Sequence, residues 1–150
     1  MHSRLLIVLA AALAAPALAP AARSRELPGP APTLSAKSSR YGRILFDGRG
    51  DVLYAFTKDR RGRSNCYGAC AKTWPVYYKK GALVTGNGVR PGLVGTTKRR
   101  NGRRQITYAG RPLYYYVGDR KPGRISCQNV VEFGGRWLVV RPNGKLVRSG

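Results

Sequence analysis

The stretch QITYAGRPLYYYVGD, residues 105–119, decides the fold of this 150-residue chain. Apolar and aromatic residues stand on both sides of a turn built around Gly110, and glycine supplies the positive φ angle that a tight turn needs. This pattern is typical of a β-hairpin. Asp119 follows Tyr114 by five positions, so we expect it at or beyond the end of the second strand.

A second copy of this pattern lies upstream, in the stretch ILFDGRGDVLYAFTKD at residues 44–59. There Asp59 follows Tyr54 by five positions, and Trp74 and Trp137 come later at similar distances in the two copies. Each half is too small to bury its hydrophobic face alone, so we expect the two to pack against each other. The two predicted repeats span about 41–80 and 104–147.

A third hairpin and one short helix complete the predicted domain. The hairpin pattern covers residues 130–140. A helix of one or two turns is expected over residues 65–74, capped by Ser64 or Asn65. The predicted fold class is mainly β: a small antiparallel β domain of two related hairpin-containing halves with one short helix.

Three segments are predicted along the chain: a signal peptide at residues 1–21, a flexible Pro-, Ala- and Ser-rich tether at residues 22–40, and the β domain at residues 41–150. The apolar run at residues 5–19 is shorter than the roughly 20 residues that span a bilayer, and small residues with A-x-A spacing follow it. We therefore expect cleavage near Ala21 and a secreted, extracytoplasmic protein whose mature form has no transmembrane helix.

The chain is strongly basic, with 28 Lys and Arg against 6 Asp and Glu and a formal net charge of +22. Such an excess favours attraction to anionic polymers. The one histidine, His2, lies in the predicted signal peptide. The mature chain therefore has no histidine for a Ser-His or Cys-His pair, or for a His-containing metal site.

The acidic residues do not favour an enzyme or a metal site. Those of the predicted β domain that could supply a carboxylate pair for glycoside hydrolysis are Asp47, Asp51, Asp59, Asp119 and Glu132. Most are needed as counter-ions among so many arginines, which suits neither a general acid nor a general base near neutral pH. No segment has the D-x-D-x-D-G pattern of a calcium loop. We expect no catalytic residues, no metal and no cofactor.

The repeated aromatic and acidic residues have a structural and a functional interpretation. In the first, the rings pack between the halves, and each aspartate binds backbone N–H groups of its turn or a neighbouring arginine. In the second, carboxylates and phenols form a site for a cation or a sugar. The composition favours the structural interpretation. The residues concerned are Tyr54, Phe56, Asp59, Trp74, Tyr114, Tyr116, Asp119 and Trp137.

Three cysteines, Cys66, Cys70 and Cys127, allow three disulfide pairings and leave one thiol over. An oxidising compartment favours one bridge, and a bridge to Cys127 would join the two halves and close the longer loop. The functional alternative is an extracytoplasmic redox or soft-metal-handling protein that uses three thiolates. A c-type haem is excluded, because the sequence has no C-x-x-C-H motif.

Basic residues recur on the predicted turns and in the basic loop that joins the repeats, where we expect the charges to remain in solvent. The anion-binding candidates are Arg60, Arg61, Arg63, Lys98, Arg99, Arg100, Arg103 and Arg104. The first hypothesis is a non-enzymatic binding or structural module that associates with anionic cell-envelope polymers or another envelope protein, with no specific small molecule implied. Non-specific nucleic-acid binding ranks third, because the protein is exported.

Four ordered blocks of the sequence resemble a bacterial family of secreted repeats and lipoproteins with a Tyr-x4-Asp motif. These blocks are residues 53–59, 66–75, 112–119 and 133–140. The resemblance covers most of the mature chain. It implies a location in the cell envelope and a bridge between Cys66 and Cys70, but no activity. Two features depart from the family: the lipid-bearing cysteine is absent, and Cys127 is an additional cysteine.

Overall fold

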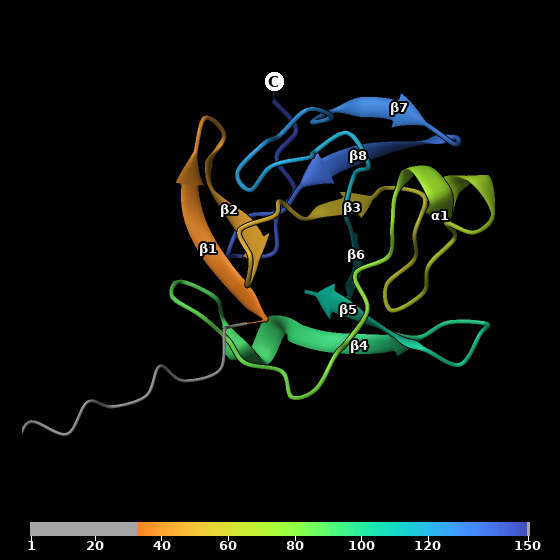
Figure 1. Cartoon of the computed structure of the whole chain (residues 1–150), viewed down its shortest axis with the longest axis horizontal. Coiled ribbons are helices and arrows are strands. Elements are labelled where there is room, and N and C mark those ends of the chain that lie inside the picture. Colours follow the sequence, from red (N-terminus) through yellow and green to blue (C-terminus); the bar gives the residue numbers. More distant parts are fainter. Residues whose placement is uncertain (1–32, 150) are drawn as a thin grey trace, which may run out of the picture.

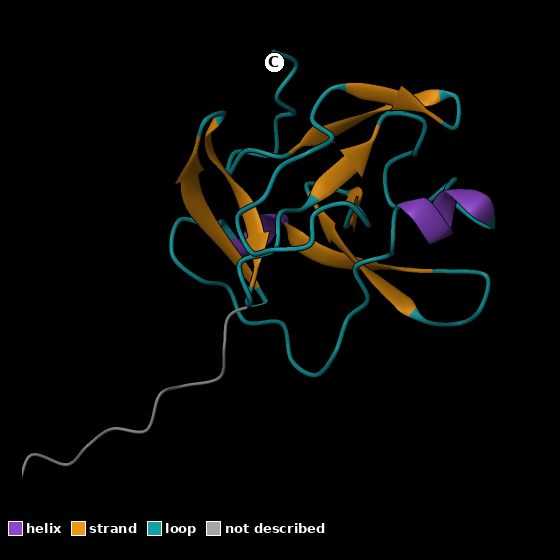
Figure 2. Ribbon diagram, turned by 45° about the horizontal axis from the view of Figure 1, so that its top comes forward, coloured by secondary structure: helices purple, strands orange, loops and turns teal. Residues whose placement is uncertain are grey.

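The computed structural model describes residues 33–149. The predicted signal peptide, residues 1–21, and the first part of the predicted tether, residues 22–32, lie outside the described residues. Strands and loops make up almost all of the described chain (Figures 1 and 2). The elements are β1 (Leu34–Ser39), β2 (Gly42–Asp47), β3 (Tyr54–Phe56), α1 (Ala69–Thr73), the 3-10 turn η1 (Pro91–Leu93), β4 (Val94–Lys98), β5 (Arg104–Tyr108), β6 (Arg111–Tyr114), β7 (Val130–Glu132) and β8 (Gly135–Val139).

Two antiparallel sheets form the domain, which confirms the predicted mainly β class. β1 and β2 pair with each other, and the remaining six strands form one sheet in the order β4-β5-β6-β3-β8-β7. Figure 1 shows the β1–β2 hairpin standing beside the larger sheet. At the centre of that sheet β3 lies next to β6, with Tyr54 directly opposite Tyr114. The two copies of the motif are therefore on neighbouring strands.

Side-chain alternation along β3 divides the core into two layers, because successive residues of a strand face opposite sides. Tyr54 and Phe56 belong to an aromatic layer that also contains Trp74 and Trp137. Ala55 belongs to a second layer, made mainly of aliphatic residues. Members of that second layer that are fully buried include Leu34, Leu45, Leu53, Ile106 and Leu113.

The two repeats exchange strands. β8, from the second repeat, pairs with β3 of the first. In return, the chain after α1 pairs with the second repeat: Tyr115 donates its N–H to the carbonyl of Pro75, and Tyr77 donates its N–H to the carbonyl of Leu113. Each repeat thus completes the sheet of the other, as expected for halves too small to fold alone.

The predicted tether is wrong over residues 34–39, because β1 occupies them. Leu34 and Ala36 are buried in the aliphatic layer, and β1 pairs with β2 along its whole length. The prolines that precede this segment led to the prediction of an extended tether in place of a strand. Its burial also depends on partners such as Leu45, which lie in another part of the chain.

The first predicted hairpin forms its turn but not a full ladder. Asp47 donates its N–H to the carbonyl of Asp51, and Leu53 donates its N–H to the carbonyl of Leu45. Beyond that point β3 leaves β2 and joins the larger sheet, while β2 pairs with β1. The second and third predicted hairpins are present as β5–β6 and β7–β8.

The short helix α1 begins later than predicted. Its N-cap is Gly68, and no side chain caps it. Ser64 and Asn65 are not caps because their side chains bind elsewhere: the Ser64 hydroxyl contacts the Tyr114 hydroxyl, and the Asn65 amide donates to the carbonyl of Lys58. The Ser64 and Asn65 side chains, predicted from local sequence to cap the helix, therefore make tertiary hydrogen bonds instead.

Candidate functional site

The two Tyr-x4-Asp motifs form a crossed pair of hydrogen bonds between the repeats. Tyr54 donates its hydroxyl hydrogen to Asp119 Oδ2 at 2.7 Å, and Tyr114 donates to Asp59 Oδ2 at the same distance. Because the two tyrosines lie opposite each other on β3 and β6, each reaches the aspartate that follows the other strand. The motif therefore joins the two repeats rather than acting within one of them.

The second carboxylate oxygen of each aspartate holds the loop that follows it. Asp59 Oδ1 accepts the N–H of Asn65 at 2.7 Å, and Asp119 Oδ1 accepts the N–H of Ser126 at 2.9 Å. The same two loops are tied at a second equivalent point, where a loop glycine donates its N–H to a turn glycine of the other repeat. These bonds join Gly62 to Gly110, and Gly123 to Gly50. The repeats are thus related by matching backbone contacts.

Burial controls the ionisation of these groups. It raises the pKa of Asp59 to about 6, although the Asn65 N–H, the Tyr114 hydroxyl and the Arg99 charge oppose that shift. Burial, with the nearby aspartates, also raises the pKa of Tyr54 and of Tyr114. Both phenols are fully buried. The phenols are therefore closed to solvent, whereas Asp59 and Asp119 are partly exposed.

A stack of rings fills the aromatic layer beside the crossed pair. Trp74 and Trp137 are stacked with their ring centroids 3.9 Å apart, and Phe56 stacks on the other side of Trp137 at 4.2 Å. Tyr116 contacts Trp74 at 4.8 Å. These equivalent tryptophans come one from each repeat, so the rings pack between the halves and add to the contact that the aspartates make.

Arg99, predicted to remain in solvent, is buried, with 5% of its surface exposed. Its guanidinium donates to Ser64 Oγ and to the carbonyl of Cys66, both at 2.6 Å, and to Gln105 Oε1 at 2.8 Å. Ser64 in turn contacts the Tyr114 hydroxyl, which leads to Asp59. The prediction failed because two of the three acceptors, Ser64 and Cys66, belong to a loop more than 30 residues away in the sequence.

The cysteines are divided between a bridge and a free thiol. Cys66 and Cys70 form a disulfide, and Cys127 is free and half-buried. Burial raises the pKa of the Cys127 thiol, which opposes thiolate formation. No group of three or more His, Cys, Asp or Glu side chains is placed to hold a metal ion in the described part of the chain.

The remaining anion-binding candidates belong to two segments that contact each other. The turn at residues 60–63 contacts the β4–β5 hairpin, because the Thr97 hydroxyl donates to the carbonyl of Gly62. We call this surface the hairpin patch. Its exposed members are Arg60, Arg61, Arg63, Lys98, Arg100, Arg103 and Arg104.

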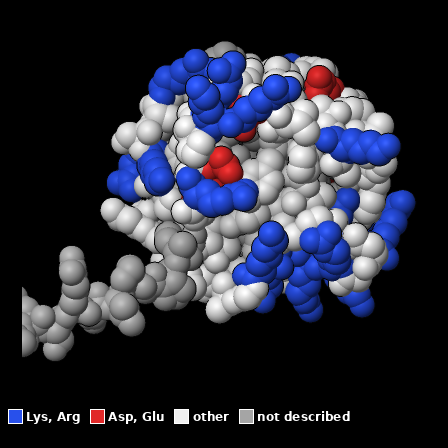
Figure 3. Space-filling model, in the orientation of Figure 1, with Lys and Arg blue, Asp and Glu red and all other residues white. Residues whose placement is uncertain are grey.

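Few of the cations among the described residues are paired with a carboxylate. Across residues 33–149, ion pairs within 4.0 Å involve a single cation, Arg49, which contacts Asp47 and Asp51. The other carboxylates are engaged by neutral donors: Asp59 and Asp119 as above, and Glu132 by the Trp74 indole N–H. Figure 3 shows Lys and Arg side chains spread over the visible face, with few acidic atoms between them.

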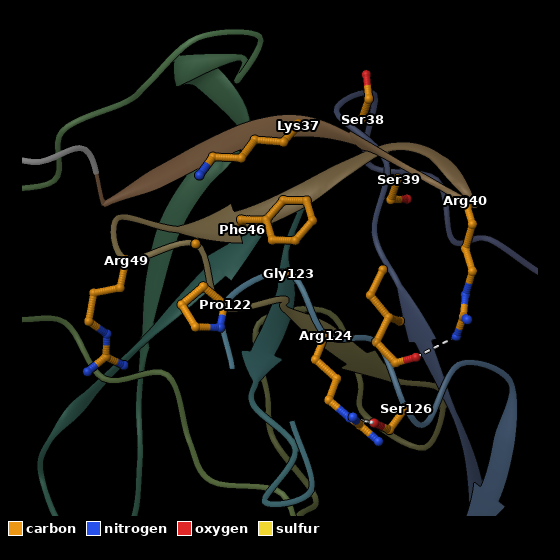
Figure 4. Close-up of a pocket in the computed structure, with 12 residues that line it drawn as sticks. Lys37, Ser38, Ser39, Arg40, Phe46, Arg49, Pro122, Gly123, Arg124 and Ser126 are labelled. Carbon is orange, nitrogen blue, oxygen red and sulfur yellow. Dashed lines mark hydrogen bonds between the residues drawn. The ribbon is translucent and has the colours of Figure 1, made fainter. Parts of the chain in front are cut away.

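A second basic surface, which the sequence did not reveal, lies between the β1–β2 hairpin and the turn at residues 120–126. It is a cleft of about 860 Å³. Lys37, Arg40 and Arg124 stand around its rim, and Phe46 and Pro122 lie toward its centre (Figure 4). The prediction missed it because part of its lining, Lys37, Ser38 and Ser39, belongs to β1, which was assigned to the tether.

Comparison with known proteins finds the same two repeats in the chain. Residues 35–77 and 95–141, together more than half of the chain, match a family described as a secreted repeat of unknown function. The chain belongs to this secreted repeat family. Its two repeats begin at residues 35 and 95, earlier than the predicted 41 and 104, because each includes a first strand, β1 or β4. No curated protein and no solved structure matches the chain.

Membership of the secreted repeat family supports a location outside the cytoplasm. Within residues 33–149, no helix has the length and apolar character that a membrane span requires. The disulfide between Cys66 and Cys70 fits the same oxidising compartment. It is also the pairing that the resemblance implied.

Proposed function

We propose that this secreted repeat protein is a non-enzymatic module that associates with anionic polymers of the bacterial cell envelope. One observation carries the proposal: a net charge of +22, with ion pairs that involve only Arg49 among residues 33–149. Exposed cations without a carboxylate partner are free to exchange their small counter-ions for a polymer. That exchange is favourable in entropy and depends strongly on salt.

The carboxylates support a binding role rather than a catalytic one. In both Asp59 and Asp119, one carboxylate oxygen accepts a hydrogen bond from a Tyr hydroxyl and the other accepts one from a loop N–H group. Asp47 accepts the Tyr115 hydroxyl and two backbone N–H groups of its own turn. A general acid or base must exchange its proton with a substrate, and these three groups are committed to holding loops.

The aromatic contacts argue against nucleic acid as the polymer. Binding of single strands relies on exposed rings on which bases stack. On the hairpin patch the two nearby rings are covered by cations instead: Arg99 and Arg100 lie over Tyr67 at 4.2 and 4.3 Å, and Arg103 lies over Tyr78 at 3.5 Å. Arg100 and Arg103 are exposed and available to a polymer, while each of the two rings already has a cation over a face.

The test is a binding titration of the exported protein at about 0.15 M salt, where charges more than ~8 Å apart are screened. The probes are a glycerol phosphate polymer, a uronic acid polysaccharide and a neutral glucan of similar length. We expect binding of the two anionic polymers, with an association constant that falls steeply as salt is raised. Equal binding of the neutral glucan, or no binding of either anionic polymer, would overturn the proposal.

A further inference from the structure

We propose that the cleft between the β1–β2 hairpin and the turn at residues 120–126 is a binding site for a flexible phosphodiester chain. This inference rests on the proposed function and names the place and the ligand class. The cleft, at about 860 Å³, lies within the ~300–1,000 Å³ of ordinary ligand sites. That volume is large enough for several units of a thin chain.

Three of the four cations that line the cleft, Lys37, Arg40 and Arg124, have uncharged partners, whereas the fourth, Arg49, pairs with Asp47 and Asp51. The Arg40 guanidinium donates to the carbonyl of Ile125 at 2.6 Å, and Arg124 donates to Ser126 Oγ at 2.9 Å, as the dashed lines of Figure 4 show. The Lys37 ammonium lies 5.9 Å from the centre of the Phe46 ring. Because these partners are uncharged, each cation keeps its full charge while its freedom of movement is reduced, which lowers the entropic cost of binding an anion.

The other repeat shows why this groove is open. The equivalent groove lies between the β4–β5 hairpin and the loop at residues 62–66, and there the Arg99 side chain fills it and bonds to Ser64 and Cys66. Arg40 makes the corresponding contact to Ile125 but stays exposed. The same architecture therefore gives a closed groove in one place and a cationic cleft in the other.

The chemistry of the cleft favours a chain of phosphates. Figure 4 shows Lys37, Arg40 and Arg124 spread around the rim rather than directed at one point, which suits several charges along a chain better than one compact anion. Serine hydroxyls also line the cleft, and hydroxyl, ammonium and guanidinium donors together match phosphate oxygens. The one aromatic ring among the residues that line the cleft, Phe46, is buried, so no surface is offered to a nucleobase.

The experiment compares two triple variants with the same change in charge. The cleft variant is Lys37→Gln, Arg40→Gln, Arg124→Gln, and the control variant, in the hairpin patch, is Lys98→Gln, Arg100→Gln, Arg103→Gln. Each replaces one lysine and two arginines, all exposed. The probe is the glycerol phosphate polymer, and the measurements are the dissociation constant and its salt dependence.

We expect the cleft variant to bind about 30-fold more weakly and to lower the slope of log K against log salt by about 2, the amount for three lost contacts. The control should weaken binding only about 3-fold, by reducing the general attraction. Equal losses in the two variants would overturn the cleft as the site and leave the proposed function intact. Failure of the unchanged protein to bind any anionic polymer would overturn both.

Two further measurements distinguish a loss of binding from a loss of folding. If the triple cleft variant unfolds at a lower temperature, the pair Lys37→Gln, Arg124→Gln is compared with Lys98→Gln, Arg100→Gln. In the unchanged protein, NMR titration should shift the amide signals of Gly123 and Ser126 before those of Asn101 and Gly102. The opposite order, or equal affinity for a single-stranded oligonucleotide of the same charge, would contradict the inference.

Discussion

The environment of Asp59 in the first repeat differs from that of Asp119 in the second, although the two aspartates accept equivalent crossed bonds and each holds the loop that follows it. Behind Asp59 lie Ser64, the buried guanidinium of Arg99 and the Cys66–Cys70 disulfide. The equivalent loop after Asp119 ends in the free thiol of Cys127. The shared contacts build the fold, and the contacts that differ decide which groove is open.

The lengths of two hairpin tips explain part of this difference. Between the paired residues Ser39 and Gly42, the β1–β2 hairpin has two tip residues, whereas the β4–β5 hairpin has five between Lys98 and Arg104. The longer tip folds into its own turn, in which Arg99 donates its N–H to the carbonyl of Arg103. Arg99 can therefore point back into the groove. The short tip leaves Arg40 at the rim.

The largest expected effect comes from breaking the closed groove. Arg99→Ala should lower the free energy of unfolding by about 4 kcal/mol, because it removes three hydrogen bonds and leaves buried acceptors without a donor. Arg40→Ala, at the exposed counterpart, should cost less than about 1 kcal/mol. Denaturant unfolding of both variants measures the difference. Similar losses would contradict the contrast between the grooves.

A pH series sharpens the contrast at Asp59. Its pKa of about 6 in the folded protein lies above the value near 3.8 of a free aspartate, so the folded state holds the proton more tightly. This contribution to stability is fully present below about pH 4 and is lost as the pH rises through 6. At ~1.4 kcal/mol for each pKa unit, it amounts to about 3 kcal/mol.

The matched variant for this pH series is Asp59→Asn, which cannot titrate. The free energy of unfolding of the unchanged protein, minus that of Asp59→Asn, should fall by about 3 kcal/mol between pH 4 and 7. Urea unfolding at each pH gives both values. A difference that stays constant across this range would show that burial does not raise the pKa of the Asp59 carboxyl group.

The cysteines provide a third test. Cys66→Ala with Cys70→Ala should lower the free energy of unfolding by about 2 kcal/mol, the amount for a bridge that closes a short loop. Cys127→Ala should cost less than about 1 kcal/mol, because that side chain is only half-buried. A thiol count on the native, metal-free protein should find one reactive group. Three thiols with stoichiometric copper uptake would favour the soft-metal alternative.

The smallest expected effect concerns the crossed Tyr–Asp hydrogen bonds, which both repeats make. Tyr54→Phe and Tyr114→Phe each remove one donor to a carboxylate and should each cost about 1.5 kcal/mol. Thermal or denaturant unfolding of the two single variants is the measurement. If one substitution were neutral while the other was costly, the crossed bonds would not contribute equally and the equivalence of the two motifs would fail.

The hairpins and the repeat could be predicted from sequence because their signals are local. The Gly110 turn and the matched spacing of Tyr and Asp predict strands and a duplication without knowledge of the rest of the chain. β1 was missed, since Leu34 and Ala36 follow a proline-rich segment and become buried only against β2 and the larger sheet. The local sequence pattern could not show that residues 34–39 pair with another strand.

The candidate site divides in the same way. Composition predicted a strongly basic chain, the N-terminal pattern predicted export, and the structure brings the turn at residues 60–63 into contact with the β4–β5 hairpin. Sequence could not show that Arg99 is buried, because a guanidinium is buried only where several acceptors meet it, and Ser64 and Gln105 come from different segments. Nor could it show that the cleft is lined by residues from two distant segments.

Sequence by itself determined the β5–β6 and β7–β8 hairpins, the duplication and the excess of positive charge, since each of these is a property of neighbouring residues or of a sum over residues. Tertiary structure alone decided that Tyr54 binds Asp119, that Tyr114 binds Asp59, and that one groove is filled while the other is open. The physical reason is that β3 pairs with β6, which places each tyrosine beside the other repeat's aspartate. Contacts between segments depend on how the strands are ordered in the sheet, and the local spacing of residues does not specify that order.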